Sequence, residues 1–197
     1  SPAPVVTADV HQRVMDEVIY PTVRGMAAEG NVYTGFLYAG LMIDKAGKPK
    51  VIEFNCRFGD PETQPIMCRL ESSLVLLVEA ALAKALDKVE ATWDPRPTVG
   101  VVIAAGGYPA DYAKGDVIEG LDAAAQLEGK VFHAGTALKD GQIVTAGGRV
   151  LCATAIGRTV EEAQQQAYRL AEKIRWNGSF YRNDIGYRAI ARERGEK

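Results

Sequence analysis

The sequence is poor in cysteine and histidine, and neither residue is spaced in a way that binds a soft metal. Its 197 residues include three cysteines (Cys56, Cys68 and Cys152) and two histidines (His11 and His133). An odd number of cysteines in a chain of this length builds no disulfide framework and is typical of a reducing compartment. Zinc-finger spacing is absent, which argues against a soft-metal site. The composition therefore predicts a cytoplasmic protein with reduced thiols.

Long apolar runs, a signal peptide, an initiator Met and dense basic tracts are also missing. No run approaches the about 18 apolar residues that a membrane span requires. The chain begins Ser-Pro-Ala-Pro, which indicates a part of a longer protein. The 23 basic and 25 acidic residues leave a formal net charge of -2. Since no tract could neutralise a run of phosphates, neither a nucleic acid nor a membrane is an expected partner.

What the sequence does have is an ordinary globular composition, with 47% hydrophobic residues, and clear periodicity in its first half. Apolar residues at helical spacing predict a helix from Thr7, a suitable N-cap, to about Glu29, kinked or split at Pro21. Aromatic and aliphatic residues at 33–43 and 49–55 predict two strands, which a short turn joins into an antiparallel hairpin.

A strongly apolar helical stretch follows a loop at residues 57–61. The stretch covers about residues 65–87, and Ser72-Ser73 can divide it in two. Its leucines from Leu74 to Leu86 are expected to form core rather than a membrane helix. Residues 93–97 contain two prolines and predict a linker.

Beyond the linker the pattern changes to short segments separated by glycines. Strands are expected at residues 99–105, 115–118, 131–136, 142–145 and 149–156, and a helix with Thr159 as its cap over residues 160–174. The pairs Gly106-Gly107 and Gly147-Gly148 fit no Walker or dinucleotide pattern, so we interpret them as turn glycines. His133 lies between two apolar neighbours and is interpreted as a packed strand residue.

The clearest chemical feature is the strand that carries Glu53 and Asn55. Side chains alternate along a strand, so these two point to one face, about 7 Å apart, while Ile52 and Phe54 point to the other face, into a core. Two neighbouring oxygen donors suit Mg²⁺, with waters and substrate phosphates completing its octahedron. A solvated outer strand face is the alternative interpretation. Cys56 falls on the Phe54 face and is expected to be a small core hydrophobe rather than a nucleophile.

The loop after this strand favours the metal interpretation. Arg57 offers a planar fork for a phosphate or a carboxylate, and Gly59 permits a tight backbone. Asp60 and Glu62, on either side of a proline, could cap a helix whose N-terminus attracts anions. For Asp60, a plain helix cap is the alternative.

The run Glu53-Phe54-Asn55, followed by Arg57-Phe58-Gly59-Asp60-Pro61-Glu62-Thr63-Gln64, resembles the phosphoribosylamine–glycine ligases, which are ATP-grasp enzymes of purine synthesis. Further stretches resemble this family in the same order, at residues 33–41, 106–109, 132–136, 147–151 and 181–186. The resemblance implies an α+β fold. Residues 1–94 would be the C-terminal portion of the ATP-grasp domain, an antiparallel sheet with helices. Residues 95–197 would be the family's C-terminal domain, small and β-rich with one helix.

The resemblance also implies a site and a reaction. Glu53 and Asn55 match the family's metal ligands, for Mg²⁺ or Mn²⁺, and Arg57, Asp60 and Glu62 match its catalytic loop beside the substrate pocket. The implied reaction joins glycine to 5-phosphoribosylamine with ATP as co-substrate. It passes through glycyl phosphate and gives glycinamide ribonucleotide, ADP and phosphate. The partner would be the N-terminal part of the same polypeptide, in a monomeric enzyme. The chain alone would be an inactive fragment, because it lacks the family's nucleotide-clamping subdomain.

Three alternatives stay open. Another ATP-grasp ligase, using bicarbonate or formate, would share the metal strand. Asp44-Lys45-Ala46, at the tip of the predicted hairpin, is similar to a lipoyl-attachment tripeptide, which would make the chain a carrier module. A purely structural fragment is also compatible with the chain taken by itself.

Overall fold

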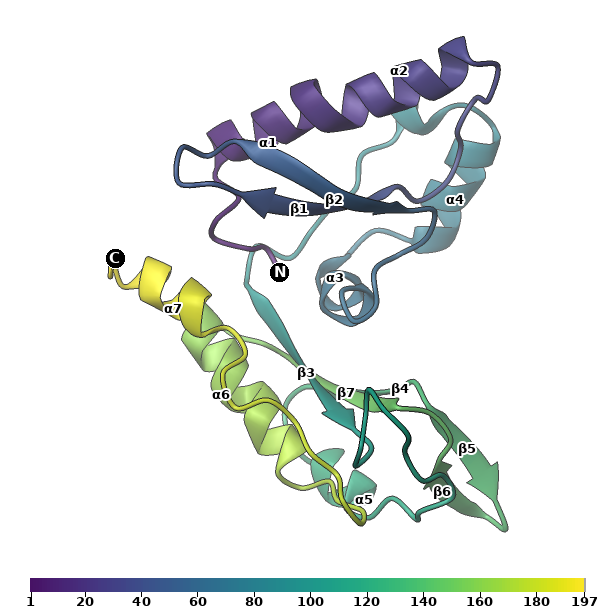
Figure 1. The fold of residues 1–197 in the computed structure, drawn as a ribbon, viewed down its shortest axis with the longest axis vertical. Helices are drawn as coiled ribbons and strands as arrows, with labels where there is room; N and C mark the ends of the chain where they lie inside the picture. The colour runs from purple at the N-terminus through teal and green to yellow at the C-terminus, as the bar shows by residue number, and fades with distance from the viewer. Residues whose placement is uncertain (197) are drawn as a thin grey trace. The chain divides into compact units, whose positions relative to one another are not determined.

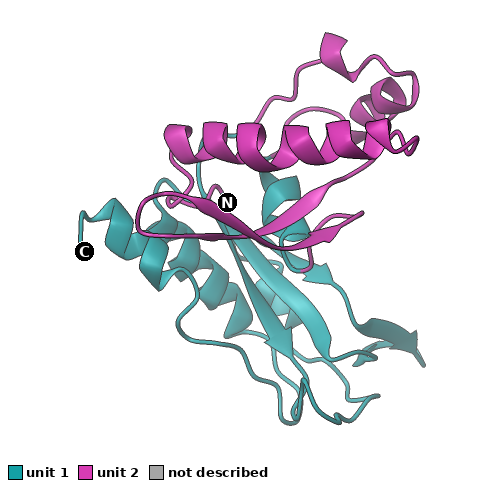
Figure 2. Cartoon of the chain, turned by 45° about the horizontal axis from the view of Figure 1, so that its top comes forward, with its two compact units in different colours: residues 1, 61–69, 94–197 teal, residues 2–60, 70–93 magenta. Residues whose placement is uncertain are grey.

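The chain forms two units in a computed structural model that describes residues 1–196. Unit 2 contains residues 2–60 and 70–93, and unit 1 contains residue 1, residues 61–69 and residues 94–197 (Figure 2). Both units combine helices with antiparallel strands, which confirms the expected α+β class. The domain ranges expected from the sequence stay a prediction. In the structure, residues 61–69 belong to the same unit as the second half of the chain.

Unit 2 begins with a helical run made of α1 (Ala8–Val14), a π-helical turn η1 (Met15–Ile19) and α2 (Tyr20–Ala28) (Figure 1). Thr7 caps the run as predicted, because its Oγ1 accepts a hydrogen bond from the Val10 N–H at 3.3 Å. Pro21 has no N–H for the helical ladder, and its ring crowds the carbonyl four residues earlier. The ladder widens to the π turn immediately before this proline, which confirms the predicted split.

The predicted hairpin is present as β1 (Tyr38–Ile43) and β2 (Pro49–Asn55), paired antiparallel in a two-stranded sheet. Its turn is closed by Asp44, whose Oδ1 accepts from the N–H groups of Ala46 and Lys48 at 2.9 Å each. The first strand starts five residues later than residue 33, because Tyr33 folds back and donates its hydroxyl to the Phe36 carbonyl at 2.7 Å.

The apolar stretch after the hairpin is divided as predicted. Helix α3 (Thr63–Arg69) belongs to unit 1, while α4 (Leu74–Leu82) and the 3-10 turn η2 (Leu86–Lys88) belong to unit 2. Ser73 caps α4, since its Oγ accepts from the Leu76 N–H at 3.4 Å.

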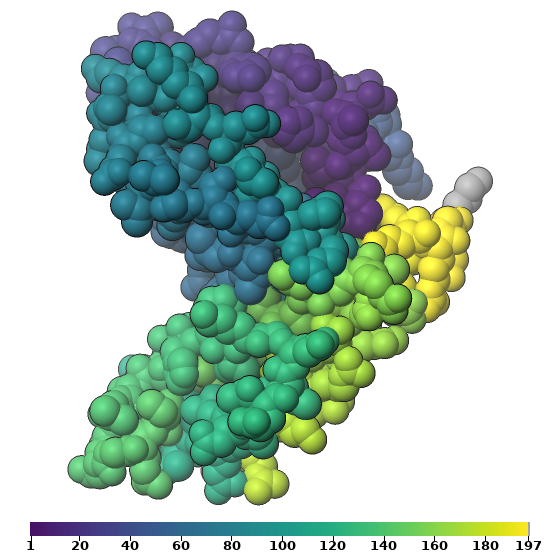
Figure 3. All heavy atoms as spheres, turned by 180° about the vertical axis from the view of Figure 1, so that it is seen from behind, coloured from purple at the N-terminus to yellow at the C-terminus, as the bar shows by residue number. Residues whose placement is uncertain are grey.

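Two expectations about the core of the first half are wrong. Ile52 and Phe54 on β2 are 66% and 41% exposed, and Leu82 on α4 and Leu86 in η2 are 74% and 50% exposed. In Figure 3 the blue-to-teal atoms of the segment around α4 form part of the visible surface. The periodicity of a strand or a helix predicts which side chains share a face, but it carries no information on what covers that face. Cys56 is also exposed, because it lies one residue past β2, in the loop.

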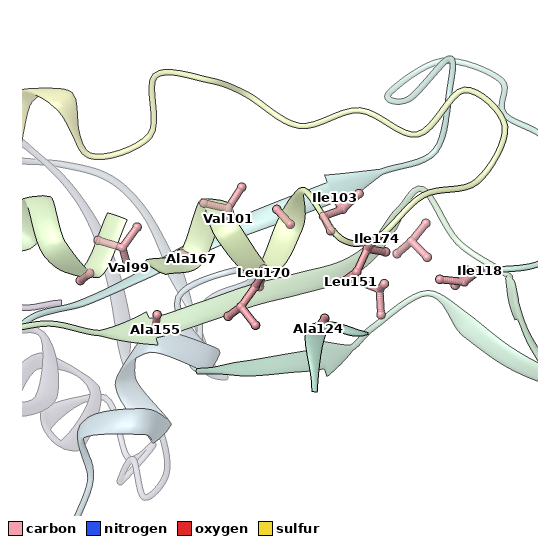
Figure 4. Packing of buried hydrophobic residues seen from close by; sticks show 14 of the residues in the cluster. Val99, Val101, Ile103, Ile118, Ala124, Leu151, Ala155, Ala167, Leu170 and Ile174 are labelled. Carbon is pink, nitrogen blue, oxygen red and sulfur yellow. The ribbon is translucent and has the colours of Figure 1, made fainter. Parts of the chain in front are cut away.

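Unit 1 is built on a three-stranded antiparallel sheet with the order β3-β7-β4. The strands are β3 (Thr98–Ala104), β4 (Lys130–His133) and β7 (Arg149–Ile156), and a separate hairpin is formed by β5 (Thr136–Lys139) and β6 (Gln142–Thr145). Helix α6 (Val160–Ala171) packs on this sheet and supplies the buried side chains Ala163, Ala167 and Leu170 (Figure 4). They meet Val101, Ile103, Leu151 and Ala153 from the strands.

Helix α3 also packs against β3 and β7. Gly100 in β3 permits this contact, because a Cβ at that position would stand 3.0 Å from Cγ of Pro65 and 3.1 Å from Sγ of Cys152. Glycine at position 100 of β3 therefore leaves room for α3 to pack closely against the strand.

Several details of the second half differ from the expectation. Residues 115–118 form an isolated bridge, Val117 to Val144, instead of a strand. The strand expected at 131–136 ends at His133 and resumes as β5, because the backbone at Gly135 turns against Gly147. His133 is exposed rather than packed, with its Nδ1 3.0 Å from Oγ1 of Thr136.

Two short helices accompany the expected α6. They are α5 (Leu121–Ala124) and α7 (Tyr187–Glu193), and the second lies in a tail for which no helix was expected. In residues 1–196 no helix combines the length and the apolar character that crossing a membrane demands.

Candidate active site

The structure brings Glu53 and Asn55 together at the end of β2. Asn55 Nδ2 donates to Glu53 Oε1 at 3.1 Å, so the two side chains share one face of the strand as alternation predicts. Glu53 is exposed and Asn55 is half-buried. Gly40 lies opposite Glu53 in the register, where a Cβ would stand 3.0 Å from Glu53 Cγ. The missing side chain on β1 thus leaves room for the Glu53 stem to cross the hairpin.

Arg57 and Asp60 follow in the loop of unit 2, and both are exposed. The Arg57 Nη1 donates to the carbonyl oxygen of Phe58 at 2.8 Å, which engages one of the five N–H donors of the guanidinium. Gly59, between Phe58 and Asp60, is buried. The loop is therefore folded on itself, with the guanidinium held beside the backbone.

Glu62 lies in unit 1, at the start of α3. Its carbonyl oxygen accepts from the Ile66 N–H at 3.2 Å, so the residue occupies the N-cap position of this seven-residue helix. The carbonyl of Glu62 thus begins the helical ladder of α3, while the helix-cap interpretation of Asp60 stays a prediction. The roles of Arg57, Asp60 and Glu62 toward a substrate stay predictions.

Aromatic side chains that the sequence analysis did not single out surround the same loop. The rings of Phe36 and Phe58 lie 4.0 Å apart between centroids, at an interplanar angle of 31°. Burial, followed by the neighbouring Cys56 thiol, raises the pKa of the Tyr33 hydroxyl. These residues come from the segments before β1 and after β2. The pairing of Tyr38 with Asn55 brings the two segments together, so a correctly predicted hairpin register could have indicated that they are neighbours.

In unit 1 the glycine-rich stretches meet at one end of the three-stranded sheet. The Ala105 N–H donates to the Gly148 carbonyl at 2.8 Å, and the Gly135 N–H donates to the Arg149 carbonyl at 3.0 Å. Arg149 Nη1 also donates to the Tyr108 hydroxyl at 3.0 Å. These contacts support the interpretation of the glycines as structural, because each allows two backbones to approach closely.

Two family models match this chain. The phosphoribosylglycinamide synthetase ATP-grasp (A) domain matches residues 1–63, and the phosphoribosylglycinamide synthetase C domain matches residues 98–188. The chain belongs to the phosphoribosylglycinamide synthetase family. Within this family, Glu53, Asn55, Arg57, Asp60 and Glu62 all fall in the part that the ATP-grasp domain model matches.

Individual relatives agree with the synthetase family. The chain is 89% identical over 196 residues to a phosphoribosylamine–glycine ligase of Pseudomonas aeruginosa and 80% identical over 196 residues to one of Pseudomonas syringae. Each match covers 100% of this chain and 46% of the relative. The crystal structure of the Thermotoga maritima phosphoribosylamine–glycine ligase superposes with a TM-score of 0.76 at 40% identity, over 90% of this chain and 43% of that one. The chain therefore spans less than half the length of these relatives.

The donor set at the end of β2 fits a hard cation of the kind that ATP-grasp synthetases use. A carboxylate and a side-chain amide can supply oxygen ligands, and the 3.1 Å bond from Asn55 Nδ2 to Glu53 Oε1 shows that the two side chains lie together. A half-turn of the amide would bring its oxygen to the same place. Among residues 1–196 no group of three or more His, Cys, Asp or Glu side chains could hold a metal ion. Mg²⁺ commonly takes one or two protein carboxylates and completes its shell with waters and substrate phosphates.

Proposed function

We propose that the chain is part of an ATP-dependent ligase that joins glycine to 5-phosphoribosylamine in purine synthesis. The observation that carries the proposal is the Glu53–Asn55 pair at the end of β2, inside the stretch that matches the ATP-grasp domain. The relatives named phosphoribosylamine–glycine ligase support the choice of substrates.

The reaction proceeds in two displacements. An oxygen of the glycine carboxylate attacks the γ-phosphorus of ATP, ADP leaves, and glycyl phosphate results. The amine of phosphoribosylamine then attacks the carbonyl carbon, phosphate leaves, and the nitrogen loses a proton. Bound Mg²⁺ or Mn²⁺ would supply charge neutralisation at the phosphates.

The residues of this chain bind and orient in that scheme. Glu53 and Asn55 would hold the cation through their side-chain oxygens. The planar guanidinium of Arg57 matches a carboxylate or a phosphate in two-point contact. Asp60 and Glu62 complete the proposed catalytic loop. Preorganised charge of this kind supplies most of the catalysis in phosphoryl transfer.

The test uses Glu53→Gln and Asn55→Ala in the full-length protein, with Glu79→Gln on α4 as the matched control. Both site variants should lower glycine-dependent ADP release by at least about 100-fold, the scale of losing a preorganised electrostatic group. Because Glu53 is exposed and Asn55 half-buried, thermal stability should change by less than about 0.5 kcal/mol. Activity and Mg²⁺ dependence that survive both changes would place the metal elsewhere. ADP release driven by bicarbonate or formate instead of glycine would favour a different ATP-grasp ligase.

The partner we propose is the N-terminal part of the same polypeptide. The chain covers 46% of its relatives, and unit 2 exposes apolar side chains on two elements, Ile52 on β2 and Leu76 and Leu82 on α4. Burial of one such side chain is worth about 1.5–3 kcal/mol, so a partner covering several would bind firmly. We also propose that the chain alone is inactive.

Mixing this chain with the separately produced remainder of the protein tests the partner. ADP release should be absent from either part and appear in the mixture. Leu82→Glu should weaken the association at least about tenfold, since a buried charge replaces an apolar contact. Leu138→Glu is the matched control, because Leu138 in β5 is 72% exposed against 74% for Leu82. Equal effects of the two variants, or turnover by this chain alone, would refute the proposal.

A further inference from the structure

The loop that carries Arg57 is tied to the segment before β1 by three contacts in series. Antiparallel pairing of Tyr38 with Asn55 places the start of β1 beside the end of β2. The residues just outside these two positions, 33–37 and 56–60, therefore leave the hairpin at the same end. This is also the end at which Glu53 and Asn55 lie.

The first contact is made by Tyr33. Its hydroxyl donates to the Phe36 carbonyl at 2.7 Å. Tyr33 thereby fixes the backbone at Phe36, whose ring makes the next contact.

The second and third contacts run through Phe58. Its ring stacks on Phe36 at 4.0 Å between centroids, and its carbonyl oxygen accepts from the Arg57 Nη1 at 2.8 Å. The ring fixes where Phe58 lies, and the carbonyl fixes where the guanidinium lies. A change at the ring pair is thus transmitted to Arg57 by two contacts.

Core packing does not account for this ring pair. Phe36 is 40% exposed and Phe58 is half-buried, and neither belongs to the buried core. We propose that Tyr33, Phe36 and Phe58, here called the aromatic cluster, are positioning residues that hold the Arg57 guanidinium for an anionic group of the substrates. This inference rests on the proposed ligase function.

Proteolysis in the full-length protein gives a readout that does not depend on activity. Trypsin cleaves after Arg57 only when the loop opens, so the cleavage rate reports how firmly the cluster holds it. Phe58→Leu and Tyr33→Phe should each speed cleavage after Arg57 at least threefold. Phe180→Leu, at a ring that is 42% exposed in unit 1, should leave it unchanged. Phe58→Tyr keeps the ring and should restore protection.

Kinetics separate positioning from mere structure. Phe58→Leu should raise the KM for glycine or for a phosphate-bearing substrate at least about fivefold, with the melting temperature within 2 °C of the parent. In an Arg57→Ala background the same change should have no further effect, because the residue it acts through is gone. Full additivity of the two substitutions, or unchanged cleavage after Arg57, would overturn the inference. Loss of the proposed function would be seen separately, as an unsubstituted full-length protein without glycine-dependent ADP release.

Discussion

Leu170→Ala should severely destabilise unit 1. Leu170 lies on α6 and is 1% exposed, among the buried side chains that α6 places on the sheet (Figure 4). Its Cδ1 packs on Gly129, where a Cβ would stand only 2.5 Å away. Backbone rather than a flexible side chain borders the site there, so little can move in to fill the space. We expect a loss of about 3 kcal/mol, within the range for buried Leu→Ala changes.

Leu82→Ala makes the same chemical change on a helix of unit 2. Leu82 is 74% exposed in α4, so its truncation leaves no cavity, and the expected loss is below about 0.5 kcal/mol. For a domain of about 100 residues, about 3 kcal/mol corresponds to a fall of about 12–24 °C in the melting temperature. Leu170→Ala should therefore move the calorimetric transition of unit 1 by that amount, and Leu82→Ala should move no transition by more than about 4 °C.

The comparison has two refuting outcomes. A large loss from Leu82→Ala in the isolated chain would show that α4 packs into a core of its own. A loss below about 1 kcal/mol from Leu170→Ala would show that α6 does not anchor unit 1. When the proposed N-terminal partner is added, Leu82→Ala should become more costly, while the cost of Leu170→Ala should stay the same.

Three further predictions concern the fold of unit 1. Arg96 holds the pKa of Asp94 down to about 2 by side-chain and backbone hydrogen bonds. Because this folded-state pKa lies below the ordinary value of 3.8, the carboxylate stabilises the fold above about pH 4, and the contribution is lost as the pH falls toward 2. Asp94→Asn should thus lower the melting temperature at pH 7, with the difference disappearing near pH 2 in calorimetry across that range. Gly120→Ala should cost at least about 2 kcal/mol in urea unfolding, because φ there is 86° and the new Cβ would collide with the Lys173 carbonyl oxygen. Thr159→Ala should cost about 1 kcal/mol in the same assay through loss of the α6 cap, and an unchanged midpoint would show that the cap is replaced by water.

Local patterns predicted the elements whose limits depend on local chemistry. Strand β2 begins at Pro49 and ends at Asn55, as expected, because turn residues precede it and a glycine-containing loop follows it. The cap at Thr159 and the division at Ser73 were predictable for the same reason, since a hydroxyl next to an apolar helical run satisfies its first N–H groups.

Long-range contacts set the limits that were missed. Residues 115–118 alternate like a strand, and their backbone is hydrogen-bonded to β6, but the pairing amounts to an isolated bridge at Val117 and Val144 rather than a ladder. The tail helix α7 has seven residues, too few for a periodic pattern, and is held by Ala189 and Ile190 packing against the unit 1 core. Neither the isolated bridge at residues 115–118 nor helix α7 could be predicted from the neighbouring residues in the sequence.

The candidate site also has one part that local geometry predicts and one part that depends on long-range contacts. Glu53 and Asn55 are two residues apart on one strand, so their common face follows from the geometry of a single element. The aromatic cluster joins Phe36 to Phe58, 22 positions later, and its contact depends on the pairing that sets Tyr38 opposite Asn55. A one-residue slip in that register would send every β1 side chain to the opposite face. It would also shift the segment before β1 relative to the Arg57 loop. The register of the hairpin is therefore as important to the proposed chemistry as the identity of the two proposed metal ligands. Substitutions at Gly40 that shift the register should lower glycine-dependent ADP release as much as the loss of Glu53.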